Sequence, residues 1–294
     1  MSFAARPRYE WRLRTRSLAV GERTLILGIL NVTPDSFSDG GHFYMPGAAP
    51  QRALEHAMGM LDEGADAIDL GGESTRPGAT PQSPDEEQAR VMPVLEAILR
   101  ERPETIVSID TFHAATARCA VEAGAEIVND VSGHLWDKEM SLTCARLACG
   151  AVLMHTRGTP AEWRSLPALE RDEVVPLVLT GLEVAVDAAV TAGVIRDRIV
   201  IDPGLGFGKR LKENYPLLRG ISALHRLELP IMVGASRKSF LAASRMGSGT
   251  NDRVAATLAA HTAAVLEGAQ ILRVHDVRPA VEAAAVADRL LAEA

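Results

Sequence analysis

The chain has 294 residues, and its 31 lysines and arginines are outnumbered by 38 aspartates and glutamates, which gives a net charge of −7. Hydrophobic residues make up 47% and charged residues 23%, fractions that are ordinary for a soluble globular protein and exclude a disordered or collagen-like chain. The negative balance argues against broad nucleic-acid binding, which depends on lysines and arginines that neutralise phosphates. We therefore expect no nucleic-acid partner.

The N-terminal segment and the cysteines predict a cytoplasmic protein. Five arginines among the first sixteen residues resemble the start of a signal peptide, but a Gly-Glu-Arg sequence at 21–23 interrupts the apolar stretch and no cleavage site is evident. No apolar run approaches the ~20 residues that span a bilayer, so no membrane partner is expected. The three cysteines, Cys119, Cys144 and Cys149, are too few for a disulfide framework and favour a reducing compartment.

Ahead of the main pattern, residues 11–15 alternate apolar and polar side chains and are followed by a turn at 21–22. This predicts a short β-hairpin, which we place at the bottom of the fold described next. The expected organisation is an N-terminal arm and hairpin over residues 1–24, followed by one domain over residues 25–294.

Eight short apolar runs, most of them rich in Ile and Val, predict buried strands. They are Leu25–Val32, Ala67–Gly72, Thr105–Asp110, Glu126–Val131, Ala151–His155, Arg198–Asp202, Pro230–Ala235 and Ile271–His275. The segments between them mostly read as helices, and this alternation predicts parallel strands joined by right-handed crossovers. Eight units favour a closed (β/α)8 TIM barrel of the α/β class, and an open doubly wound sheet is the alternative.

Local signals mark where the predicted helices begin and end. Glycine tolerates the left-handed backbone that closes a last helical turn. The glycines that follow apparent helices are Gly64, Gly124, Gly150, Gly193 and Gly268. Ser83 and Glu86 form a capping-box pattern at a helix start. Pro93 interrupts the apolar stripe that follows, which predicts a kink or two short helices.

Polar side chains stand at the carboxyl ends of the predicted strands. They are Asn31, Glu73, Asp110, Asn129, His155, Asp202 and His275, and the remaining strand runs into Ser236, Arg237 and Lys238. Any one of them could be a satisfied polar group of the core. Their coincidence at strand ends is better explained by an active site, because this is the active-site face of a (β/α)8 barrel.

The residue types in this cluster suit a polar heterocycle. Asp110, Asn129 and Asp202 can accept hydrogen bonds from amino and ring N–H groups, and Lys238 can donate to a carbonyl or ring nitrogen.

The same cluster also suits an anion. Arg273 and His275 alternate on one strand and so point to the same side. The planar guanidinium of Arg273 could also lie on a flat ring. Two loops, 31–41 and 73–78, follow the first two strands and are rich in Gly, Pro, Ser and Asp, which makes them candidate lids.

Eight segments identify a known family. In chain order they are GILNVTPDSFSDGG, DLGGESTRPGA, SIDT, NDVSG, LMHTRGTP, DPGLGFGK, GASRKSF and RVHDV. They resemble the signature segments of dihydropteroate synthases over nearly the whole chain, from Leu25 to Val277, and the first two are highly specific. The departures are small: His134 stands where the family often has Gly, and Thr156 where Met is common.

The resemblance implies a transferase of folate biosynthesis. Such an enzyme joins 6-hydroxymethyl-7,8-dihydropterin diphosphate to p-aminobenzoate, forming 7,8-dihydropteroate and pyrophosphate. It also implies Mg2+ as cofactor, sulfonamides as competitors of p-aminobenzoate, and a homodimer, which we place on the Ala-rich helices predicted at 252–267 and 279–293.

The resemblance further implies a role for individual residues. The pterin edge would be held by Asp110, Asn129, Asp202 and Lys238, and the ring faces would be lined by Met154, Phe207, Gly234 and Arg273. The diphosphate would be held by Asn31, Arg273 and His275, with Asn31 also a ligand of Mg2+. The p-aminobenzoate side would be formed by Phe37, Thr75, Arg76, Pro77 and Ser236. The residues expected to act in the chemical step are Asp39, Arg76, Lys238, Arg273 and His275, with Asp35 as a further candidate.

The expected mechanism needs no covalent intermediate. An aryl amine is a weak nucleophile, so catalysis depends on the leaving group, whose growing charge Mg2+, Arg273 and His275 would neutralise. Departure of pyrophosphate leaves a pterin-methyl cation, which Asp110 and Asp202 would stabilise while the closed loops exclude water.

Three alternatives remain on the sequence alone. A corrinoid methyltransferase could share the pterin acceptors, but it would not need Arg273 and His275 or the STRPG loop. A Schiff-base aldolase built on Lys238 would require a desolvated lysine, whereas this site is polar. A non-catalytic pterin-binding paralogue should lack a loop residue or a diphosphate ligand, and none is missing.

Overall fold

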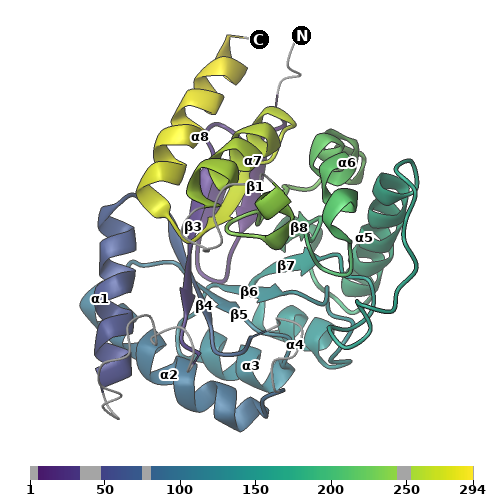
Figure 1. The fold of residues 1–294 in the computed structure, drawn as a ribbon. Coiled ribbons are helices and arrows are strands. Elements are labelled where there is room, and N and C mark those ends of the chain that lie inside the picture. Colours follow the sequence, from purple (N-terminus) through teal and green to yellow (C-terminus); the bar gives the residue numbers. More distant parts are fainter. Residues whose placement is uncertain (1–5, 34–47, 75–80, 244–252, 294) are drawn as a thin grey trace.

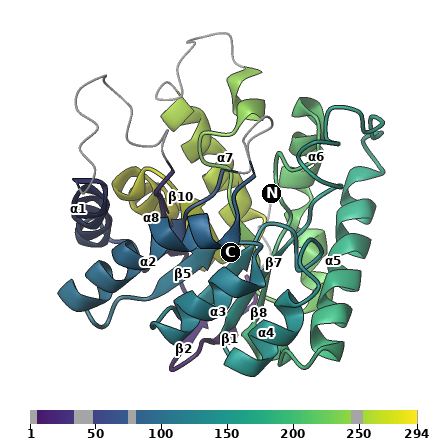
Figure 2. The same cartoon turned by 90° about the horizontal axis from the view of Figure 1, so that it is seen from below.

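The computed structural model describes residues 6–33, 48–74, 81–243 and 253–293. Strands and helices alternate along the chain, with the helices lying outside the strands (Figures 1 and 2). The barrel strands are β3 (Leu25–Asn31), β4 (Ala67–Gly71), β5 (Val107–Asp110), β6 (Ile127–Asp130), β7 (Gly150–Met154), β8 (Ile199–Asp202), β9 (Met232–Val233) and β10 (Ile271–Val274). The helices are α1 (Ala48–Asp62), α2 (Pro84–Glu101), α3 (Ala114–Glu122), α4 (Met140–Leu147), α5 (Val174–Thr191), α6 (Asn214–Arg219), α7 (Val254–Leu266) and α8 (Val277–Ala292).

The eight strands form a parallel barrel, as the sequence predicts. Their order in the sheet is β8-β7-β6-β5-β4-β3-β10-β9, so neighbours in the chain are neighbours in space. A parallel bridge between Ile201 on β8 and Ile231, just before β9, links the two ends of the sheet. The open doubly wound alternative is therefore wrong.

The N-terminal hairpin closes the bottom of the barrel. Strands β1 (Tyr9–Arg12) and β2 (Ser17–Val20) pair antiparallel. The buried side chains of Trp11 and Leu13 pack with residues from the amino ends of the barrel strands, such as Leu25 and Ile271. The indole of Trp11 donates a hydrogen bond to the carbonyl of Arg198 over 2.9 Å. The hairpin therefore shares one apolar cluster with the barrel interior, and the division at residue 24 stays a prediction.

Helix boundaries correct two details of the sequence interpretation. Helix α2 continues through Pro93 as one helix, so the alternative of two helices is wrong. Because Pro93 is exposed, the carbonyl it leaves without a helical partner faces water, while Val91, Leu95 and Ile98 on the other face are buried. The capping box of Ser83 and Glu86 is present as predicted.

Gly150 does not end a helix, contrary to the sequence interpretation. Helix α4 ends at Leu147, the left-handed residue is Ala148 (φ 50°), and Gly150 begins β7. A Cβ at Gly150 would lie 2.9 Å from the side chain of Leu13. Glycine is needed here because the hairpin approaches the strand closely. At the other four predicted stops the glycine does have a positive φ, as expected for Gly64, Gly124, Gly193 and Gly268.

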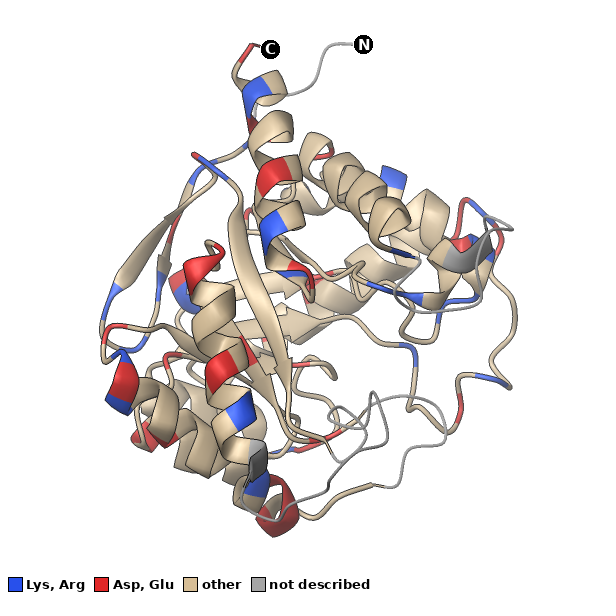
Figure 3. Ribbon diagram, turned by 60° about the vertical axis from the view of Figure 1, so that its left-hand side comes forward, with Lys and Arg blue, Asp and Glu red and all other residues tan. Residues whose placement is uncertain are grey.

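The surface of the barrel is formed by amphipathic helices on which charges of both signs are interspersed (Figure 3). Among the described residues, α5 alone is long and apolar enough to cross a membrane, by length and composition only. Its residues Val174, Val178, Leu182 and Val186 are buried in the cluster that surrounds the barrel. A helix that covers a protein core meets the same criterion.

Candidate active site

Strand register brings one row of polar residues together at the carboxyl ends of the strands. Asn31 on β3 pairs with Gly71 on β4, Gly71 pairs with Asp110 on β5, and Asp110 pairs with Asn129 on β6. Gly71 leaves space within this row. A Cβ there would lie 3.4 Å from Oδ2 of Asp110 and 3.5 Å from Oδ1 of Asn31. The side chains of Asn31 and Asp110 therefore flank the same glycine.

Arg273 joins this row from β10, which is far from these strands in the sequence but pairs with β3 in the barrel. Its Nε lies 2.5 Å from Oδ2 of Asp69, and its Nη2 forms an ion pair with Asp110. Oδ2 of Asp69 also accepts a hydrogen bond from the amide of Asn129 over 3.0 Å. Asp69 has no exposed surface. Four strands, β4, β5, β6 and β10, thus meet in one network of charged hydrogen bonds.

Asp69 is the residue that the sequence interpretation missed. It lies within the apolar run of β4, two residues before the end of the strand, so the sequence pattern assigns it to the strand and not to the polar residues at the strand ends. A carboxylate inside an otherwise apolar strand is itself a signal, because burying it without a partner is costly. In the folded chain Asp69 orients both Arg273 and Asn129.

Burial sets the protonation of the network. It raises the pKa of Asp110 to about 7, against the opposing effect of Arg273. Burial acts to lower the pKa of Arg273, but Asp69 and Asp110 outweigh it and raise that pKa above its ordinary value. The guanidinium is therefore charged at all working pH values, and it opposes the protonation of Asp110 that burial favours.

A second group of residues lies beside Arg273. A Cβ at Gly234 would lie 3.7 Å from Cβ of Arg273 and 4.0 Å from Oδ2 of Asp202, so this glycine leaves room over both side chains. Oδ1 of Asp202 accepts a hydrogen bond from the N–H of Gly204 over 2.7 Å. Burial raises the pKa of Asp202 to about 6, and Lys238 and Arg273 act to lower it.

Strand register also places Met154 next to Asp202. The ammonium of Lys238 lies 4.0 Å from the centroid of the Phe207 ring, in cation–π geometry. An apolar surface formed by Met154 and Phe207 thus borders a carboxylate and an ammonium, a combination that suits a flat polar ring.

His275 stands two residues after Arg273 and is held by Ser236. The main-chain N–H of His275 donates to Oγ of Ser236 over 3.1 Å, and the ring Nδ1 of His275 lies 3.0 Å from the same oxygen. Burial, with Arg273 and Arg237 nearby, lowers the pKa of His275 to about 3. The ring is therefore neutral at physiological pH. Arg237 itself is bidentate to Asp276 and does not join the network around Asp69.

Two strand-end residues of the predicted cluster lie elsewhere. Glu73 lies 3.1 Å from Nε2 of His113 and accepts the N–H of Gln82. The ring of His155 packs against Gly181 of helix α5. Glu73 is thus a satisfied polar group, as the sequence allows for any single position, whereas Nδ1 of the buried His155 ring has no hydrogen-bond partner among the described residues.

Six of the predicted residues lie outside the described part of the chain. They are Asp35, Phe37, Asp39, Thr75, Arg76 and Pro77. Their expected roles stay predictions. The other predicted site residues are all described, and they lie at the carboxyl ends of the barrel strands or in the loops that follow them.

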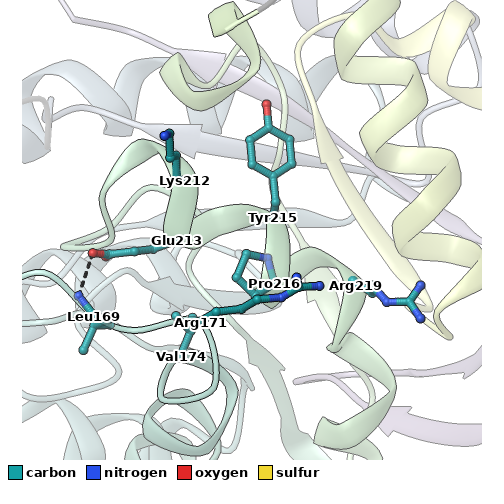
Figure 4. A pocket seen from close by; sticks show the side chains of 8 residues that line it. All are labelled: Leu169, Arg171, Val174, Lys212, Glu213, Tyr215, Pro216 and Arg219. Atoms are coloured by element: carbon teal, nitrogen blue, oxygen red, sulfur yellow. Dashed lines mark hydrogen bonds between the residues drawn. The ribbon is translucent and has the colours of Figure 1, made fainter.

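A surface pocket of about 510 Å3 lies between the loop that precedes α5 and helix α6 (Figure 4). It is lined by Leu169, Arg171, Val174, Lys212, Glu213, Tyr215, Pro216 and Arg219. None of the predicted site residues is among them. The carboxylate in this lining, Glu213, is already occupied, because it accepts the main-chain N–H groups of Leu169 and Arg210.

The fold and the network together define a class: a (β/α)8-barrel enzyme whose mouth is built to hold a polar heterocycle beside an anion-binding arginine and histidine. The pterin binding enzyme family matches residues 27–275. A dihydropteroate synthase of Synechocystis is 41% identical over 92% of this chain and 91% of its own length. The chain belongs to the pterin-binding enzymes and, within them, to the dihydropteroate synthase family.

Solved structures of that family superimpose on the chain. The dihydropteroate synthase of Xanthomonas albilineans, solved with 4-aminobenzoic acid, has a TM-score of 0.87 and 38% identity, covering 97% of this chain and 99% of its own. The enzyme of Yersinia pestis, solved with a sulfonamide drug, has a TM-score of 0.86 and 38% identity, covering 95% and 98%. The barrel and the N-terminal hairpin thus belong to a known architecture.

The Asp69–Arg273 contact predicts a large loss of stability when it is broken. Replacing Asp69 with Asn should lower the free energy of unfolding by about 3 kcal/mol, because a buried guanidinium loses one of its two charged partners and keeps only Asp110. The matched control is Asp62→Asn, which removes the charge that pairs with Arg102 at a 65%-exposed carboxyl and should leave the free energy of unfolding nearly unchanged. Urea unfolding of both variants measures this, and equal losses would contradict the role assigned to Asp69.

Proposed function

We propose that this chain joins 6-hydroxymethyl-7,8-dihydropterin diphosphate to p-aminobenzoate (4-aminobenzoate), releasing pyrophosphate and forming 7,8-dihydropteroate. The observation that carries this function is the network of Asp69, Asp110, Asn129 and Arg273 at the barrel mouth, in a member of the dihydropteroate synthase family. The related enzymes solved with 4-aminobenzoic acid and with a sulfonamide drug support the second substrate and its competitors.

The pterin edge is read by oxygen acceptors. The side-chain NH2 of Asn129 donates to Asp69. The side-chain carbonyl oxygen of Asn129 is therefore left as an acceptor for the pterin ring. Asp110 and Asp202 supply carboxylates for the amino and ring N–H groups. Lys238 donates to the ring carbonyl or to a ring nitrogen. Met154, Phe207 and the plane of Arg273 cover the ring faces, and Gly234 leaves room for them to do so.

The diphosphate is bound by donors left over from the network. Asp69 and Asp110 occupy Nε and Nη2 of Arg273, so Nη1 is the guanidinium nitrogen left to face an anion. In neutral His275 we assign the ring proton to Nε2. The hydroxyl oxygen of Ser236 accepts the main-chain N–H of His275, and the hydroxyl can then donate its own proton to Nδ1 of the ring. Two donor nitrogens, Nη1 of Arg273 and Nε2 of His275, then face the leaving group.

Mg2+ fits this site as a companion of the diphosphate. Among the described residues, no cluster of three or more His, Cys, Asp or Glu could hold a metal ion alone. The amide oxygen of Asn31 at the end of β3 is one suitable ligand, and Mg2+ is commonly bound by one or two protein oxygens together with substrate phosphates and water. When bound there, it would neutralise charge on the departing pyrophosphate.

The protein residues favour breaking the carbon–oxygen bond before the amine attacks. The electron pair of that bond goes to pyrophosphate, where Arg273 and His275 stabilise the new charge. The methylene carbon and ring become cationic, and the carboxylates of Asp110 and Asp202 beside the ring would stabilise that charge. The lone pair of the aryl amine then forms the carbon–nitrogen bond, and its proton is lost to pyrophosphate or solvent. No side chain needs to act as a nucleophile.

Lys238 is better explained as a pterin ligand than as a Schiff-base nucleophile. Its ammonium lies against Phe207 and within the field of the Asp202 carboxylate, both of which favour the charged form. A corrinoid methyltransferase would leave Arg273 and His275 without an anion to bind. These observations favour the synthase over both alternatives.

The activity is tested by measuring pyrophosphate released from the pterin diphosphate with Mg2+, with and without p-aminobenzoate, and by identifying the product by mass. Release that depends on p-aminobenzoate and yields dihydropteroate is expected. A sulfonamide should compete with p-aminobenzoate. Tight binding of the pterin diphosphate with no product would instead indicate the non-catalytic paralogue.

Binding of the pterin ring should weaken as the pH falls through about 7 and then about 6, because burial raises the pKa of Asp110 to about 7 and that of Asp202 to about 6. Above these pH values the carboxylates accept hydrogen bonds from the ring, and below them each carboxyl holds its own proton. The affinity for 6-hydroxymethyl-7,8-dihydropterin, which carries no diphosphate to titrate, measures this by calorimetry. The Asp202→Asn variant should bind the pterin weakly at every pH. An unchanged affinity in that variant would mean that the pterin ring does not bind beside Asp202.

We also propose a homodimer through the surface of helices α7 and α8. On α8 the side chains of Val286 and Leu290 are 62% and 46% exposed and stand four residues apart, so they form an apolar pair on one outer face of the helix. Light scattering should give a mass of two 31.4 kDa chains, and Val286→Glu should shift it toward one. A single-chain mass for the unaltered protein would contradict the proposal.

A cytoplasmic location is the third part of the proposal. All three cysteines are free thiols, and Cys144 and Cys149 are buried. The substrates are also small charged molecules that a cytoplasmic enzyme can draw from solution. These two observations support a reducing compartment.

A further inference from the structure

Lys209 is a buried lysine that the mechanism above does not use. It lies in the loop that follows β8, and only 5% of its surface is exposed. Its ammonium donates to three main-chain carbonyls: those of His155 at 3.1 Å, Gly204 at 2.8 Å and Phe207 at 3.1 Å. An ammonium has three N–H donors, so this one is fully satisfied by protein.

The three carbonyls belong to the segments that carry the proposed pterin contacts. His155 directly follows Met154 at the end of β7. Gly204 donates its N–H to Asp202, and Phe207 carries the ring that Lys238 covers. One ammonium therefore ties together the main chain beside Met154, Asp202 and Phe207.

The local preferences of the loop around Lys209 do not favour one ordered conformation, because three of its residues are glycines with positive φ. They are Gly204 (66°), Gly206 (83°) and Gly208 (67°). Glycine loses more conformational freedom on ordering than any other residue. A Cβ at Gly204 would also lie 2.0 Å from the carbonyl oxygen of His155, so the two segments are in close contact there.

Other residues fasten the same loop on its outer side. Arg157 donates to the carbonyl of Gly208 over 3.1 Å and to that of Pro167 over 3.1 Å. Asn214 accepts the N–H of Gly206 over 2.6 Å. Lys209 differs from both because its charge also acts on Asp202.

The charges around Lys209 are mixed. Burial lowers the pKa of Lys209 to about 7, Asp202 and Glu213 act to raise it, and Lys238 and Arg157 act to lower it. The ionised form of Asp202 therefore helps to keep Lys209 charged, and a charged Lys209 in turn favours the carboxylate that accepts hydrogen bonds from the ring.

We propose that Lys209 is a positioning residue for the pterin substrate, holding the ends of β7 and β8 together so that Met154, Asp202 and Phe207 form a preordered wall. This inference rests on the proposed function. Without the ammonium, the glycine-rich loop has to be ordered when the ligand binds, and that cost appears as lost affinity.

The test compares Lys209→Met with Lys212→Met. Lys212 is an exposed lysine three residues later, in the lining of the surface pocket, so the control makes the same chemical change outside the wall. Calorimetry with the pterin diphosphate should show a Kd raised about 10- to 100-fold in Lys209→Met, as expected for lost hydrogen bonds to a charged group. The KM for p-aminobenzoate should change by less than about threefold, and Lys212→Met should match the unaltered protein.

Thermal unfolding separates positioning from a purely structural role. A lowered Tm with an unchanged Kd for the pterin diphosphate would overturn the proposal. If Lys209→Met does not fold, Lys209→Gln takes its place. Its uncharged amide can donate to at most two of the three carbonyls, so a smaller rise in Kd is expected, and an unchanged Kd together with a lowered Tm would overturn the proposal. Failure of the unaltered protein to bind the pterin diphosphate would instead refute the proposed function, so the two failures are distinguishable.

Discussion

The buried charge of Asp69 is the constraint on which the mouth of this barrel depends. A carboxylate with no exposed surface needs a cation and hydrogen-bond donors, and here Arg273 and Asn129 supply them. Each of these residues comes from a different strand, so the contact fixes the relative positions of β4, β6 and β10. The same contact decides which atoms of Arg273 and Asn129 remain for a ligand.

The sequence predicts the architecture well because its signals are strong and local. Eight apolar runs separated by helical segments lead to a parallel barrel, and the residues at their ends lead to the active-site face. The two errors in the fold have a common cause. Gly150 and Pro93 were interpreted by their usual local effects, whereas packing against Leu13 decides the first and solvent exposure of one helix face tolerates the second.

The predicted site is less complete, and the reasons are physical. Asp69 is hidden within an apolar strand, and Lys209 resembles a solvated loop lysine until the three carbonyls around it are known. Glu73 and His155 stand at strand ends but are engaged elsewhere, because position along a strand does not determine where a side chain points after the strand ends. The surroundings of each of these side chains depend on tertiary contacts, which cannot be predicted from the residue pattern of a single segment.

The order of the strands also bears on how the protein is made. Every ladder of the barrel sheet joins two strands that are neighbours in the chain, except the one between β3 and β10, which lie near opposite ends of the sequence. Arg273 lies on β10, so Asp69 and Asp110 lack their cation until almost the whole chain has left the ribosome. A nascent chain therefore passes through a stage in which these carboxylates must remain hydrated, and completion of the barrel and pairing of the charges at its mouth become one event.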